Sequence, residues 1–94
     1  YEYNHNFSIR ILQLMFDHDN IFKIIEEALE LSKGSINIDS SQENVENWDS
    51  LGQLSILSAL DEQSGGKVAD IPELAGALSS KEIIDILKDN LLVK

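Results

Sequence analysis

One serine in this sequence stands where a side chain could be presented to another molecule. Ser50 lies between Asp49 and Leu51, at the start of a run of leucines with helical spacing. A serine there can cap the helix, and Gln53, three residues later, would complete a capping box. It can also be exposed in the first turn, where unpaired backbone N–H groups favour an attached anion. Both interpretations stay open on local grounds.

Ser50 is a better candidate for a modified residue than for a nucleophile. No histidine lies near it in the sequence and no G-x-S-x-G turn surrounds it. The chain has no cysteine, and His5 and His18 are too few for a zinc site. The run 17–19 is Asp-His-Asp, but no EF-hand glycine or glutamate follows it, so we interpret it as a helix cap. We therefore expect neither catalysis nor a metal site.

The composition limits the possible partners. The 94 residues predict one small domain, whose modest core favours function carried on the surface. Seventeen acidic and seven basic side chains give a formal charge of −10, which repels phosphate backbones and anionic lipids. We expect no nucleic-acid or membrane partner; the acidity either confers solubility alone or also steers basic protein partners. No secretory or membrane-spanning pattern is visible, so we expect a cytoplasmic protein.

Helical patterns account for most of the chain after residue 16. Apolar stripes and capping residues predict four helices: Asn20–Leu31, Leu51–Leu60 continuing to the glycines at 65–66, a short Leu74–Leu78, and a last one holding Ile83, Ile84, Leu87 and Leu91. We expect Asp19 or Asn20 to cap the first helix and Gly34 to stop it. Asp70 and Ser79 are the expected caps of the last two helices.

Two segments lie outside these helices. Ile36, Ile38, Val45 and Trp48 are expected to pin the loop of residues 35–48, which is long for a small domain. Near the start of the chain, Phe7, Ile9 and Ile11 alternate as in a strand but would also suit a frayed helical turn. We treat residues 1–15 as an N-terminal extension and residues 16–94 as the folded domain.

The helix order predicts an all-α fold, a small four-helix bundle with a long first loop and a short third helix. In this arrangement the chain resembles the acyl carrier protein family, whose D-S-L motif starts the second helix. Asp49-Ser50-Leu51 matches that motif, and Leu54 to Glu62 continue much as the family's second helix does. The resemblance covers residues 16–92. D-S-L alone is a weak motif, but its position, the helix order, the loop length, the size and the acidity agree with it.

The resemblance implies a covalent cofactor and a set of roles. Ser50 would carry 4′-phosphopantetheine, transferred from coenzyme A by a phosphopantetheinyl transferase. Acyl groups would then be held as thioesters on this arm, loaded by acyl or aminoacyl ligases or acyltransferases with basic docking patches. Asp49 would cap the helix or contact the transferase, and Leu51 would guide the arm or join the core. The residues expected to dock partners onto this monomer are Glu46, Trp48, Asp61 and Glu62, although Trp48 is equally suited to anchoring the loop.

Departures from the family pattern bear on the pathway. Gly52, Gln53 and Ser55 stand where fatty-acid carriers usually have several carboxylates, and Ser64 replaces a large apolar residue. These differences favour a specialised lipid, polyketide or other acyl-transfer pathway over general fatty-acid synthesis. A peptidyl or aminoacyl carrier with the same arm, and an unmodified helical adaptor, remain as alternatives.

Small side chains indicate where cargo could be held. The side chains between the second and third helices are expected to fill little volume, because this region contains Ala59 and Ser58 on the second helix and Ala75, Gly76 and Ala77 on the third. We therefore expect the third helix to form the mobile wall of any acyl cavity.

Overall fold

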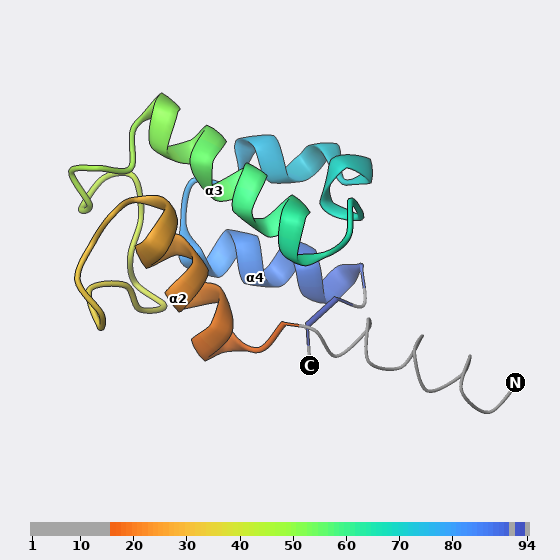
Figure 1. The fold of residues 1–94 in the computed structure, drawn as a ribbon, viewed down its shortest axis with the longest axis horizontal. Coiled ribbons are helices and arrows are strands. Elements are labelled where there is room, and N and C mark those ends of the chain that lie inside the picture. Colours follow the sequence, from red (N-terminus) through yellow and green to blue (C-terminus); the bar gives the residue numbers. More distant parts are fainter. Residues whose placement is uncertain (1–15, 91, 94) are drawn as a thin grey trace, which may run out of the picture.

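The computed structural model describes residues 16–90, 92 and 93, and helices dominate this region (Figure 1). It contains the α-helices α2 (His18–Ala28), α3 (Ser50–Gln63) and α4 (Ser80–Asp89), and the 3₁₀ helices η1 (Val68–Asp70) and η2 (Pro72–Gly76). Within the described residues no strand is present, only two isolated β-bridges, Phe16 with Val93 and Ser41 with Ser79. The helical class is thus confirmed, but in the described region a pair of 3₁₀ helices replaces the α-helix expected at 74–78.

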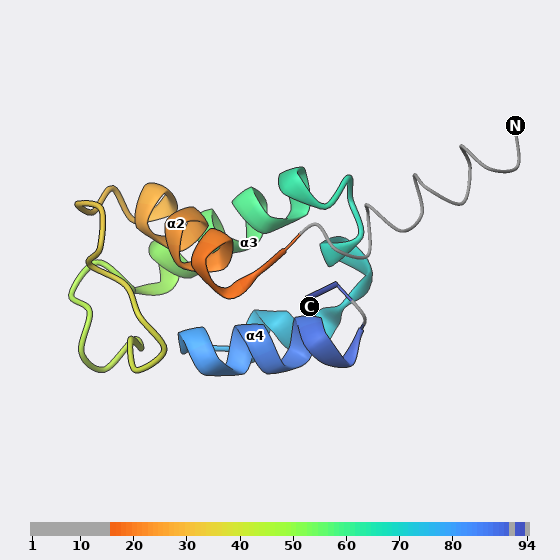
Figure 2. The same ribbon diagram turned by 90° about the horizontal axis from the view of Figure 1, so that it is seen from below.

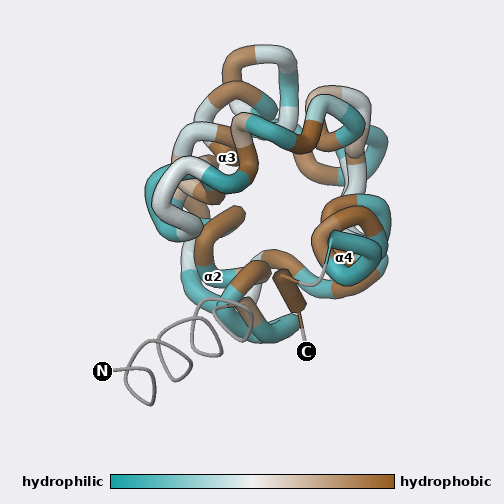
Figure 3. The backbone as a smooth tube through the Cα atoms, turned by 90° about the vertical axis from the view of Figure 1, so that its right-hand side faces the viewer, coloured by the Kyte–Doolittle hydropathy of each residue, from teal (hydrophilic) through white to brown (hydrophobic). Residues whose placement is uncertain are grey.

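The helices form two layers around one apolar core. Figure 2 shows α2 and α3 in one layer. The other layer contains α4 and, behind it, the 3₁₀ helices η1 and η2, which together are called the 3₁₀ segment. Figure 3, which looks along the long axis, shows these elements surrounding a common centre. The core includes Trp48, Phe16, Ile21, Ile25, Ile56, Leu60, Leu74, Ile83, Ile84 and Leu87, each at most 2% exposed. The apolar stripes expected on the first and last helices therefore do face inward.

The ends of α2 differ from the expected ones. Asp17 is the N-cap, and its carboxylate accepts the backbone N–H of Asn20 at 2.7 Å. At the other end Glu30 adopts a left-handed φ of 58°, and the N–H of Leu31 bonds to the carbonyl of Glu26 at 2.8 Å. The expected range, Asn20–Leu31, was therefore wrong by two residues at its start and by three at its end. The helix starts earlier because Asp17 caps it, and it ends earlier because Glu30 adopts the left-handed conformation before Gly34 is reached.

The cap expected for α4 is confirmed, whereas that of the preceding helix is wrong. Ser79 accepts the N–H of Glu82 at 3.1 Å, and its hydroxyl donates to the Glu82 carboxylate at 3.0 Å. Asp70 belongs to η1 instead of capping η2, which begins with Pro72 after Ile71 and has no side-chain cap. Because proline has no backbone N–H, a 3₁₀ turn that begins with it has one fewer donor to satisfy, and the aspartate is not needed as an acceptor.

The loop before α3 is anchored to the core by three of the four expected residues. Ile36 and Trp48 are 4% and 1% exposed, and Val45 packs against the core from a partly buried position. Ile38 is 41% exposed, so its expected role as an anchor was wrong. The loop has other attachments that replace it.

Hydrogen bonds supply those attachments. The buried carboxylate of Glu26 accepts the backbone N–H groups of Gly34 and Ile36, at 2.9 and 3.0 Å. Further along, the N–H of Ser80 bonds to the carbonyl of Ser40 at 2.9 Å, which joins the loop to the start of α4. The loop is therefore a fixed part of the fold and holds the start of α3 in place.

Some expectations lie outside the described residues: the strand-like alternation at Phe7, Ile9 and Ile11, the role of His5, and the burial of Leu91. Across the residues that are described, no helix combines the length and apolar content needed to cross a bilayer.

Candidate functional site

Ser50 is the first residue of α3 and does not cap it. The N-cap is Asp49, which has an extended backbone and whose carboxylate accepts the N–H of Gly52 at 2.8 Å. The capping box expected between Ser50 and Gln53 was therefore wrong, and Asp49 performs the capping role that was one of its two expected functions. Ser50 is exposed at the N-terminal end of a fourteen-residue helix.

Gln53 serves the core instead of the cap. It is 7% exposed, and its side-chain oxygen accepts the indole N–H of Trp48 at 2.7 Å. Its amide nitrogen donates to the carbonyls of Leu74 and Ala77, both at 3.1 Å. One side chain thus joins the loop before Ser50, the first turn of α3 and the 3₁₀ segment.

A close contact fixes the first turn of α3 against α2. A Cβ atom added at Gly52 would lie 2.7 Å from the Leu29 side chain and would collide with the carbonyl oxygen of Asn47. The amide of Asn47 in turn donates to the carbonyl of Leu29, at 3.0 Å, near the C-terminal end of α2. Ser50 is therefore carried on a rigid support, although its own side chain is exposed.

Trp48 does not belong to a docking surface. It is 1% exposed, and its indole nitrogen is bonded to Gln53. Its expected role as a partner contact was wrong, and the alternative role of loop anchor is the observed one. Of the acidic docking candidates, Glu46 and Glu62 are exposed and Asp61 is partly buried.

The leucines of α3 are divided between core and surface. Leu60 is fully buried and Leu57 partly buried, whereas Leu51 and Leu54 are 75% and 61% exposed. Leu51 therefore does not join the core, which was one of its two expected roles. A shallow hollow on this side of α3 is lined by Leu51, Leu54, Ser55, Ser58, Ala59 and Glu62, so the two exposed leucines lie among small side chains and one carboxylate.

Comparison of the chain with models of known protein families, with curated proteins and with solved structures gave no match.

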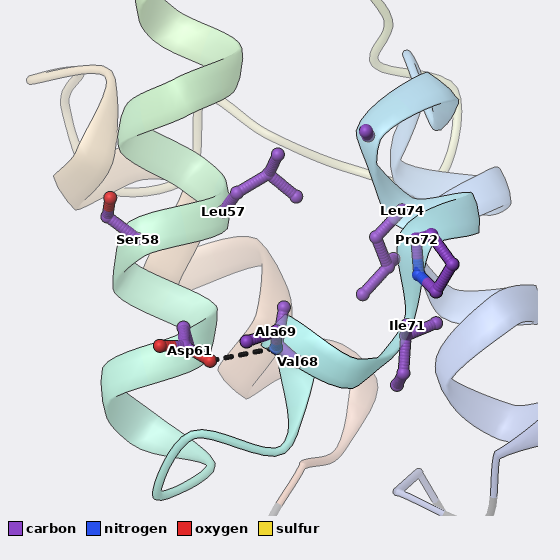
Figure 4. A pocket seen from close by; sticks show the side chains of 9 residues that line it. Leu57, Ser58, Asp61, Val68, Ala69, Ile71, Pro72 and Leu74 are labelled. Carbon is purple, nitrogen blue, oxygen red and sulfur yellow. Dashed lines mark hydrogen bonds between the residues drawn. The ribbon is translucent and has the colours of Figure 1, made fainter.

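A groove of about 300 Å³ lies between the second half of α3 and the 3₁₀ segment (Figure 4). Leu57 points across it toward Leu74. At one end the carboxylate of Asp61 accepts the backbone N–H of Ala69 at 2.9 Å. Ala75 lines the groove as expected from its small size, but Ala59 does not; it is partly buried and packs against the core elsewhere on α3.

Titratable groups give no sign of acid–base chemistry at Ser50. Among the described residues the one ion pair, Lys81 with Asp85 at 2.8 Å, lies on the surface of α4. Their hydrogen bond raises the pKa of Lys81 and lowers the pKa of Asp85. In the described region no three His, Asp or Glu side chains are grouped closely enough to hold a metal ion. The arrangement is suited to presenting a serine, not to activating one.

Proposed function

We propose that this chain is a carrier protein that holds acyl intermediates as thioesters on a 4′-phosphopantetheine arm attached to Ser50. One observation carries the proposal: Asp49 supplies the cap of α3, so Ser50 is left exposed at the first helical position. A serine that has no structural task, on a support this rigid, is accessible to a modifying enzyme without any rearrangement of the fold.

The start of α3 also suits an attached phosphodiester. The N–H of Gly52 is occupied by Asp49, but those of Ser50 and Leu51 belong to the first turn and have no acceptor inside the helix. These groups and the helix dipole favour a negative charge by about 0.3–1 kcal/mol. The Asp49 carboxylate opposes this effect, and its hydrogen bond to the cap explains its presence there.

The arrangement of elements is compatible with the acyl carrier plan. A long loop separates α2 from α3, and η1 and η2 occupy the place of the short third helix before α4. We infer that the four-helix bundle of this family is the parent architecture, with the third helix reduced to 3₁₀ turns. Such a carrier would act as a cytoplasmic monomer, without nucleic-acid or membrane partners.

The surface around Ser50 indicates what its enzymes must offer. Leu51 and Leu54 form an exposed apolar pair beside it, Glu62 lines the same hollow as these leucines, and Glu46 and Asp61 add further negative charge. We infer that the phosphopantetheinyl transferase, and the ligase or acyltransferase that loads the arm, receive the leucines in an apolar hollow with basic residues at its rim. Truncating a leucine that enters such a hollow should reduce binding more than removing a rim charge.

Incubation with coenzyme A and a broad-range phosphopantetheinyl transferase, followed by intact-mass spectrometry, tests the proposal. We expect the mass to rise by one phosphopantetheinyl group. Ser50→Ala should abolish the gain, and Ser55→Ala, which changes another exposed serine of α3, should keep it. An unchanged mass of the native chain would favour the unmodified adaptor, for which the exposed leucine pair would be the binding surface.

A further inference from the structure

A continuous stripe along α3 leads from Ser50 to the groove. Ser50, Leu54, Leu57 and Asp61 follow one another at intervals of four, three and four residues, which places them on one face of the helix. Asp61 is only about 20° around the helix from Ser50 and about 16 Å further along its axis. Leu54 is exposed, Leu57 lines the groove and Asp61 stands at its end (Figure 4).

Asp61 places a negative charge in a groove whose other lining is mostly apolar. Leu57, Leu74 and Ala75 belong to its apolar lining. One carboxylate oxygen accepts the N–H of Ala69, and within the described residues Asp61 forms no ion pair. A carboxylate in this position disfavours a purely hydrocarbon occupant and favours one that brings a cation to it.

On the side of the groove nearer Ser50, a side-chain link joins α3 to the 3₁₀ helix η2. Gln53 lies one turn before Leu57 and is hydrogen-bonded to the carbonyls of Leu74 and Ala77, so it ties α3 to η2 on the side nearer Ser50. An arm attached to Ser50 must therefore run over the surface, past Leu54, and enter beyond Gln53. This route leads to Leu57 and then to Asp61.

The length of the arm matches this route. A phosphopantetheine arm has about thirteen bonds between phosphorus and sulfur, which corresponds to about 15 Å when extended. The thioester then lies beside Asp61, and a substituent on the carbon next to the carbonyl lies within reach of the carboxylate. We infer that the groove selects a small aminoacyl group, whose ammonium binds Asp61 while its side chain packs among Leu57, Leu74 and Ala75. This inference rests on the proposed function, since it assumes an arm on Ser50.

A chemically attached arm tests the inference without any transferase. Because the chain contains no cysteine, Ser50→Cys introduces a single thiol into it. The thiol can be alkylated with pantetheine-length tethers that end in alanyl or isobutyryl amides, which have nearly the same shape and differ by an ammonium in place of a methyl group. The backbone N–H of Ala69, which is bonded to Asp61, is the reporter for NMR shift and hydrogen exchange.

We expect the alanyl tether to shift the Ala69 resonance and to slow its exchange about two- to fivefold relative to the isobutyryl tether, as a partly exposed ion pair would. Asp61→Asn keeps an oxygen for Ala69 and should remove the difference between the tethers. Glu62→Gln, which removes the same charge from the adjacent exposed residue, should preserve it.

Equal effects of the two tethers, or a difference that persists in Asp61→Asn, would overturn the inference. Failure of the proposed function has a separate signature, because the native Ser50 chain would then gain no mass with coenzyme A and a transferase, whatever the tethered Ser50→Cys protein shows.

Discussion

Replacing Gln53 with leucine should destabilise the protein far more than a polar residue on a helix normally would. The substitution removes three hydrogen bonds and leaves the indole N–H of Trp48 and the carbonyl of Ala77 without their side-chain partner. The carbonyl of Leu74 keeps a second donor, the N–H of Ala77 at 3.1 Å. Two buried groups that each lose their partner predict a loss of about 2–4 kcal/mol in the free energy of unfolding. That is a large part of the roughly 5–15 kcal/mol typical of a small domain.

Urea unfolding followed by circular dichroism measures this loss, with Gln63→Leu as the matched control. Gln63 is the last residue of α3 and is exposed, so its replacement should change the free energy of unfolding by less than about 0.5 kcal/mol. Hydrogen exchange should also accelerate in residues 74–77 of the Gln53→Leu variant, because their tie to α3 is lost. A loss no larger than that of the control would refute the account of Gln53 as the link between loop, helix and 3₁₀ segment.

Three further predictions concern the support of Ser50, the surface beside it and the groove. Gly52→Ala should cost about 1–3 kcal/mol in chemical unfolding, because the new methyl group collides with the preceding loop; Gly76→Ala, where space is open, should leave the unfolding midpoint nearly unchanged. Leu54→Ser should leave stability within about 0.5 kcal/mol yet lower kcat/KM for arm transfer, so an unaltered rate would contradict docking through this leucine. In the acylated protein, Ala75→Leu should reduce the rise in Tm produced by the cargo and Ala59→Leu should not; equal effects would argue against cargo in this groove.

The sequence was sufficient for α2 and α4 but not for the orientation of α3. In α2 and α4 the apolar residues occupy one side and most charges the other, with the buried Glu26 of α2 as the exception, although the cap of α2 was not the expected one. In α3 the leucines at 51, 54, 57 and 60 recur every third residue. Three residues fall short of a full helical turn, so each leucine is displaced by about 60° around the helix axis from the one before it. The four therefore cannot all face one core. The observed buried positions include Gln53, Ile56 and Leu60, spaced as one helical face requires.

The site was predicted in part. Ser50 was located correctly at the start of its helix, but both Asp49 and Ser50 are good capping residues, and only the backbone conformation decides between them. The burial of Gln53 could not be predicted, because its partners Leu74 and Ala77 are more than twenty residues away. A polar side chain on the buried face of a helix, five residues after a tryptophan, is the signal that could have indicated it.

The most direct test of the central claim is localisation of the arm by tandem mass spectrometry, after the native chain has reacted with coenzyme A and a phosphopantetheinyl transferase. We expect a single added phosphopantetheinyl group on the peptide that contains Ser50, present in Ser55→Ala and missing from Ser50→Ala. An arm found on another serine, or no addition to a natively folded chain, would contradict it.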